Sequence, residues 1–186
     1  MKVIAHENNG KEQQAALAKG GRGAPPADHQ PNQMVSGKKE SLTLGGVPVE
    51  LYHWGPAHTN GDLVVLLPNE KTVFTGDIIA ANRPEPLIHL EKNGSSEGWI
   101  ETAKGLAALD AEIFIPGHGA PQTKSEIDSR ISKAEGKRTK ILDLISQGKS
   151  LDEIKAAVGD PATTPNGSGP NFPTFTEVVY QESARK

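Results

Sequence analysis

Three short segments of the chain carry side chains that can bind a metal ion, each just past a predicted strand. They are His58-Thr59-Asn60-Gly61-Asp62, Thr75-Gly76-Asp77 and Pro116-Gly117-His118-Gly119. Glycine beside a strand end lets the backbone turn sharply, so that a neighbouring side chain can point into a cleft. Neutral imidazoles and a carboxylate suit zinc, or iron or manganese in the same geometry. Each segment alone also fits an ordinary turn; the three together favour a metal site.

The composition limits the ligands and the partners. The chain has no cysteine, so thiolate ligands and disulfides are excluded, and a metal must be held by His, Asp or Glu. The net charge of −3 gives no electrostatic reason to expect nucleic acid or an anionic membrane as a partner. No apolar run approaches the ~20 residues of a membrane span. Without a recognisable signal peptide, the sequence predicts a cytoplasmic location, or a periplasmic or secreted one if an upstream segment is missing.

Turn signals and apolar runs predict the strands that must position the three segments. The pair Gly45-Gly46 predicts a hairpin between strands at residues 41–44 and 47–54. Residues 63–67 are continuously apolar, which suits a strand buried on both faces. Further strands are expected at residues 3–5, 72–75 and 112–115, the last of them ended by Pro116-Gly117.

The helices are predicted from apolar periodicity and from their first residues. Capping boxes at Thr123 to Glu126 and at Ser150 to Glu153 predict two helix starts, with helix ends near Gly148 and Gly159. Other helices are expected at residues 11–19, 97–109 and 175–183. The segments 20–37 and 160–173 are rich in Gly, Pro and Asn and are predicted to be loops.

The three candidate segments, with the residues before them, resemble motifs of a known family. The runs from Gly55 to Asp62, Phe74 to Asp77 and Ile115 to Gly119 resemble the third, fourth and fifth metal motifs of the metallo-β-lactamase superfamily. The resemblance implies an α/β fold: part of an αββα sandwich, with mixed, mostly antiparallel sheets flanked by helices. Residues 1–159 would then form a partial domain of this type, and the loop and helix at residues 160–186 would pack on it.

The resemblance also implies a function and a ligand set. In that family two zinc ions hold a bridging hydroxide that attacks a carbonyl, ester or phosphoryl centre. His58 would serve the first metal, His118 the second, and Asp77 would bridge the two. An aspartate at position 77 argues against the β-lactamase subclass that has cysteine there, and it suits the thioesterase, lactonase and general-hydrolase branches better. The resemblance implies a small-molecule substrate in which an ester, thioester, lactone or lactam-type bond is cleaved.

One motif of the family is absent from this sequence. The first motif, His-x-His-x-Asp-His, supplies ligands to both metals, and neither His6 nor His29 belongs to such a pair. The expectation is a truncated domain with its N-terminal portion missing, an incomplete metal site and at most partial zinc occupancy. The alternative is a non-catalytic remnant, or a half-protein that needs a complementary N-terminal segment. Self-association through an uncovered sheet is expected in either case.

Three further residues are weaker candidates for the site. Thr59 and Asp62 either orient His58 through its second ring nitrogen or only cap a turn. His89 lies in the loop after Asp77, where it either lines the substrate cleft or is an exposed loop residue.

Overall fold

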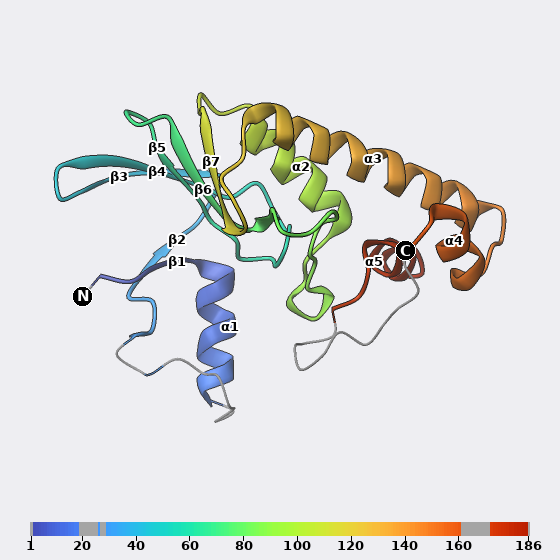
Figure 1. Cartoon of the computed structure of the whole chain (residues 1–186). Helices are drawn as coiled ribbons and strands as arrows, with labels where there is room; N and C mark the ends of the chain where they lie inside the picture. Colours follow the sequence, from blue (N-terminus) through green and yellow to red (C-terminus); the bar gives the residue numbers. More distant parts are fainter. Residues whose placement is uncertain (1, 19–25, 27–28, 161–171, 186) are drawn as a thin grey trace.

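The computed structural model describes residues 2–18, 26, 29–160 and 172–185, and Figure 1 shows their arrangement. Of the segments predicted above, Lys19 and residues 20–25, 27–28 and 161–171 lie outside the described residues. The strands are β1 (Ile4–His6), β2 (Gln33–Val35), β3 (Lys39–Leu44), β4 (Val47–Tyr52), β5 (Val64–Leu67), β6 (Thr72–Ala80) and β7 (Ile113–His118). The helices are α1 (Glu7–Ala18), the short 3-10 helix η2 (Leu90–Lys92), α2 (Ser96–Ala107), α3 (Lys124–Ser146), α4 (Leu151–Val158) and α5 (Phe175–Ser183).

The main sheet has five strands in the order β3-β4-β5-β6-β7, and every neighbouring pair is antiparallel except β6 and β7. The hairpin between β3 and β4 turns at Gly45 and Gly46, whose φ angles are 58° and 87°. This left-handed region is open to glycine at little cost, which explains why the pair marks the turn. The mixed, mostly antiparallel sheet flanked by helices confirms the predicted α/β fold class.

A second, two-stranded sheet was not predicted from the sequence. We expected residues 20–37 to be a loop, and this was wrong for β2, which pairs in parallel with β1. Three residues are too few for a periodic pattern, so the pairing is decided by tertiary contacts. Val35 of β2 is buried and packs in a small apolar cluster with Val49 and Leu51 of β4. The small sheet therefore covers part of one face of the main sheet.

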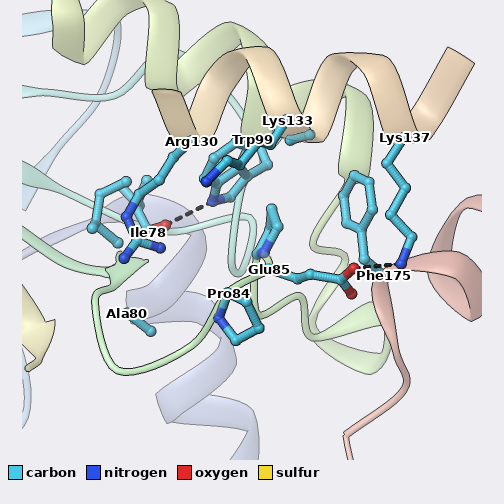
Figure 2. Close-up of a pocket in the computed structure, with 12 residues that line it drawn as sticks. Ile78, Ala80, Pro84, Glu85, Trp99, Arg130, Lys133, Lys137 and Phe175 are labelled. Carbon is cyan, nitrogen blue, oxygen red and sulfur yellow. Dashed lines mark hydrogen bonds and ion pairs between the residues drawn. The ribbon is translucent and has the colours of Figure 1, made fainter. Parts of the chain in front are cut away.

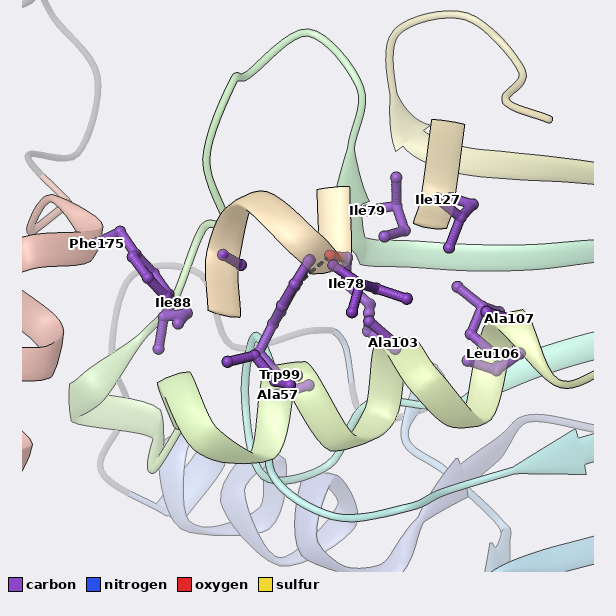
Figure 3. Packing of buried hydrophobic residues seen from close by; sticks show 14 of the residues in the cluster. Ala57, Ile78, Ile79, Ile88, Trp99, Ala103, Leu106, Ala107, Ile127 and Phe175 are labelled. Atoms are coloured by element: carbon purple, nitrogen blue, oxygen red, sulfur yellow. Dashed lines mark hydrogen bonds between the residues drawn. The ribbon is translucent and has the colours of Figure 1, made fainter. Parts of the chain in front are cut away.

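Helices α2, α3, α4 and α5 cover the opposite face of the main sheet and enclose the principal core, part of which Figure 3 shows. Val64, Val73 and Phe114 reach this core from β5, β6 and β7. Trp99 and Leu106 of α2 pack there, together with Ile127 of α3 and Phe175 of α5 (Figure 3). Burying each large apolar side chain contributes roughly 1.5–3 kcal/mol. Helix α5 thus packs in the same core as the sheet.

The helix starts follow from local sequence. Both predicted capping boxes, at Thr123 with Glu126 and at Ser150 with Glu153, are formed. A third, which we did not predict, joins Thr174 to Glu177 at the start of α5. Each satisfies backbone N–H groups that a helix start would otherwise leave without partners.

A search of the helices among the described residues for a membrane-spanning segment finds none with the necessary length and apolar character.

The second face of the main sheet is apolar and only partly covered. The pairing register places Leu51, Val65, Phe74 and Ile115 in one row across β4 to β7. We expected residues 63–67 to be buried on both faces; Val64 and Leu66 are buried on the helix side, whereas Val65 and Leu67 are only half-buried. The most exposed large side chains of this face are 39% to 45% exposed, at Leu44, Val47, Phe74 and Ile113.

We propose that this exposed apolar face drives self-association of the chain. Replacing Phe74 by Gln should weaken the association constant about tenfold, because burying one large apolar side chain contributes roughly 1.5–3 kcal/mol. Sedimentation at several concentrations measures the change. Leu17→Gln is the matched control, since Leu17 is similarly exposed but lies on α1. Equal effects of the two substitutions, or a monomeric parent chain, would contradict the proposal.

Candidate functional site

His58 is held by contacts to the segment that follows β6. The side chain is buried, and its Nδ1 lies 2.8 Å from the carbonyl oxygen of Leu87. The backbone carbonyl of His58 accepts a hydrogen bond of 2.8 Å from the N–H of His89. A carbonyl oxygen can only accept, so Nδ1 of a neutral His58 ring must carry the proton. In this tautomer the free lone pair is on Nε2, which can therefore bind a metal.

Thr59 and Asp62 hold the turn after His58 rather than its ring. Both carboxylate oxygens of Asp62 accept hydrogen bonds from Thr59, one from the backbone N–H at 2.8 Å and one from the hydroxyl at 2.6 Å. The N–H of Gly61 donates to the Thr59 hydroxyl. The contact that orients His58 through its second nitrogen is therefore the carbonyl of Leu87. A backbone carbonyl has no sequence signal, which is why Leu87 was not singled out.

Asp77 is placed by an irregularity in the pairing of β6 with β7. The register shifts on both sides of Gly76, whose φ angle is 53°, and Gly76 lies opposite Pro116. Such bulges bend a strand and redirect its side chains. We expected strands at residues 72–75 and 112–115, the second ended by Pro116; the ends were wrong, because pairing continues to Ala80 and His118. A proline is tolerated at a bulge, where a ladder hydrogen bond is already lost.

A close approach beside Asp77 requires glycine at position 117. A Cβ atom there would lie 2.1 Å from Oδ1 of Asp77, far inside van der Waals contact. Gly117 therefore lets the end of β7 pass next to the carboxylate, and His118 follows directly. The glycines of the second and third candidate segments thus have definite roles, in a redirected strand and in a close contact.

The structure brings His58, Asp77 and His118 together. Nε2 of His58 lies 3.8 Å from Oδ2 of Asp77, and Nε2 of His118 lies 3.4 Å from Oδ1. Each imidazole thus faces a different oxygen of one carboxylate. The two separations are longer than hydrogen bonds. They match the spacing of two ligands of one zinc ion, each roughly 2.0–2.2 Å from the metal. The donor chemistry and spacing therefore fit two metal positions that share Asp77.

The number of donors at each position is small. Within the described residues, no group of three or more His, Cys, Asp or Glu side chains is close enough to hold one metal ion. Each position has one histidine and a share of Asp77, whereas catalytic zinc sites usually have three protein ligands. His6 does not join them in such a group; its buried ring stacks on His53 with 3.8 Å between centroids. The described residues thus offer fewer donors at either position than a catalytic zinc site has.

His89 forms one wall of the site beside His58. Its ring meets the His58 ring edge-on at 5.1 Å and the Phe172 ring at 4.4 Å. Burial is the main cause that lowers the pKa of His89, followed by the nearby His58. Phe172 comes from the segment before α5 and was missed, since a lone aromatic residue in a polar stretch gives no signal of its role. A ring from each of three distant segments therefore packs at this wall.

Comparisons with known proteins identify one family and several similar structures. A family model described as the metallo-beta-lactamase superfamily matches residues 2–118. The alpha subunit of 2,4-dinitroanisole O-demethylase from Nocardioides sp. (strain JS1661) is 23% identical over 119 residues, 64% of this chain and 35% of that protein. The metallo-beta-lactamase type 2 of Bacteroides fragilis is 28% identical over 102 residues, 53% of this chain and 38% of that protein. The chain thus spans little more than a third of either relative.

Two solved structures show the same fold at low identity. The DIM-1 metallo-beta-lactamase superposes with a TM-score of 0.55 at 20% identity, over 73% of this chain and 58% of that one. The stereoselective inverting sec-alkylsulfatase Pisa1 from Pseudomonas sp. has a TM-score of 0.59 at 17% identity, over 81% of this chain and 24% of that one. At such identities the likeness concerns the fold alone.

The close approach of Gly94 to the backbone of His58 can be tested for its role in positioning His58. A Cβ on residue 94 would lie 2.3 Å from the backbone carbonyl oxygen of His58. We expect Gly94→Ala to destabilise the chain by about 1–3 kcal/mol, as overpacking does, and to displace His58. Urea unfolding measures the loss. Gly136→Ala is the control: in the middle of α3, with nothing near its Cβ, it should stabilise by about 0.5–1 kcal/mol. A neutral Gly94→Ala would show that this contact does not fix His58.

Proposed function

We propose that this chain, which belongs to the metallo-beta-lactamase superfamily, supplies three metal ligands of a metal-dependent hydrolase. The hydrolase would act on an ester, thioester, lactone or lactam. The observation that carries the proposal is the Asp77 carboxylate between two imidazoles, with its two oxygens 3.8 and 3.4 Å from the Nε2 atoms of His58 and His118. His58 and Asp77 would hold one ion, and Asp77 and His118 the other. Zinc, when bound, would polarise the scissile bond and activate water.

The chain's own residues would perform three tasks. Asp77 would keep the two positions adjacent, because one carboxylate serves both. The carbonyl of Leu87 would keep the ring of His58 in the form whose Nε2 is free to bind. His89 and Phe172 would limit the space on the His58 side and exclude water there, since their rings pack edge-on against one another. These contacts favour a substrate that approaches from the side of His118, whose side chain is 58% exposed.

A second candidate function is a non-catalytic metal-binding chain, or a half that needs a complementary segment. The observation that favours it is the donor count: one histidine and a shared carboxylate at each position within the described residues. A loosely held ion exchanges readily and gives little catalysis.

Zinc retention tests the shared role of Asp77. After extensive dialysis the chain should retain less than two equivalents of zinc by elemental analysis, because the described residues give neither proposed position three protein ligands. Asp77→Asn should lower retention more than His58→Ala or His118→Ala alone, since each histidine serves one position. Asp110→Asn, which removes an exposed carboxylate paired with Lys71, is the matched control. Two equivalents held tightly, or equal losses in Asp77→Asn and Asp110→Asn, would contradict this ligand assignment.

Activity separates the two candidate functions. Alone, the chain should hydrolyse ester, thioester, lactone and lactam substrates negligibly. A polypeptide segment carrying His-x-His-x-Asp-His, added with zinc, should raise hydrolysis, and Asp77→Asn should abolish the rise while Asp110→Asn keeps it. If no such segment raises the rate although both chains bind zinc, the non-catalytic function is favoured.

A further inference from the structure

A cavity of about 220 Å³ lies between the end of β6, residues 84–86 and one face of α3 (Figure 2). Its apolar walls include Ile78, Ile79, Trp99 and Phe175. The indole N–H of Trp99 already donates to the carbonyl of Ile78, so the ring offers the cavity an apolar surface. None of the lining residues is His58, Asp77 or His118. The cavity is smaller than the roughly 300–1,000 Å³ of drug-sized sites, which suits a short apolar group.

Three cations of α3 line the same cavity. Arg130, Lys133 and Lys137 recur at spacings of three and four residues, which places them on one face of the helix. Like charges at such spacings destabilise a helix unless something compensates them. Anionic or carbonyl partners on the cavity side would offset this repulsion.

Among the described residues, two of these cations have partners and one has none. Arg130 donates from its two terminal nitrogens to the backbone carbonyls of Arg83 and Ala81. Lys137 bonds to the carboxylates of Glu85 and Asp160, and these contacts raise its pKa against the effect of burial. Lys133 has no hydrogen bond or ion pair to another described residue. The three cations and these two carboxylates together carry a net charge of +1.

We propose that this cavity binds a small monocarboxylate with an apolar chain. The chain would lie against Trp99 and Phe175, and the carboxylate would meet the ammonium of Lys133 at the rim. A cation would be repelled by the excess positive charge, and a neutral molecule would leave Lys133 without a partner. The proposal does not depend on a hydrolytic function. Because Ile78 and Ile79 directly follow Asp77, an occupant would also brace the strand end that carries this ligand.

The two tryptophans of the chain, Trp54 and Trp99, give a test with an internal reference. The full chain is labelled with 5-fluorotryptophan, titrated with octanoate and followed by 19F NMR, with Trp54→Phe assigning the two resonances. We expect the Trp99 resonance to shift saturably and the Trp54 resonance to stay. Lys133→Gln should raise the dissociation constant about five- to tenfold, as expected for a charge-assisted contact at a partly exposed rim. The substituted side chain is exposed, so folding should be preserved.

Controls separate the proposed site from non-specific binding. Lys38→Gln removes the same charge from an exposed position before β3 and should leave the dissociation constant unchanged. Octanol, with the same chain length and no charge, should bind more weakly than octanoate. The proposal is overturned if the resonances of both tryptophans shift in parallel, or if no resonance shifts saturably. It is also overturned if octanol binds as tightly as octanoate, or if Lys133→Gln leaves the dissociation constant for octanoate unchanged.

Discussion

The hydrogen bond between His58 Nδ1 and the carbonyl of Leu87 connects the parts of the structure on which the candidate site depends. It joins the turn after β4 to the segment after β6, and it decides which ring nitrogen of a neutral His58 is free. The same two segments meet again where the N–H of Ser95 donates to the carbonyl of Ala57, and Ser95 is the N-cap of α2. The start of α2 is therefore hydrogen-bonded to the turn that carries His58. The packing of α2 in the core and the position of His58 thus depend on each other.

The two faces of the main sheet differ in what they contribute. The face toward α2 and α3 holds the large buried side chains and stabilises the fold. The other face is covered only in part by the small β1–β2 sheet and leaves Phe74 and Ile113 exposed. The ligands come from the turn before β5, from β6 itself and from the end of β7. Helix packing can therefore hold the ligand-bearing segments in place even where the second face is uncovered.

Much of the fold could be predicted from local signals, because these depend on few residues. A glycine pair set the β3–β4 hairpin, and two capping boxes set the starts of α3 and α4. The strand β2 and the true end of β6 were not predicted, since both depend on pairing with distant segments. The three candidate ligands were singled out by residue type and by the adjacent glycines, and the structure places them around one carboxylate. Leu87 and Phe172 were missed because a backbone carbonyl and a lone ring acquire roles only through folding.

The carbonyl of Leu87 holds His58 with its proton on Nδ1, so that Nε2 faces Asp77. Long-range 1H–15N correlation spectra of the histidine rings, recorded on the metal-free chain at a pH where the ring is neutral, test this most directly. We expect His58 Nδ1 to have the chemical shift of a protonated nitrogen and Nε2 that of an unprotonated one, and we expect zinc to move the Nε2 signal. A proton on Nε2, or an averaged pair of shifts that zinc leaves unchanged, would contradict this assignment.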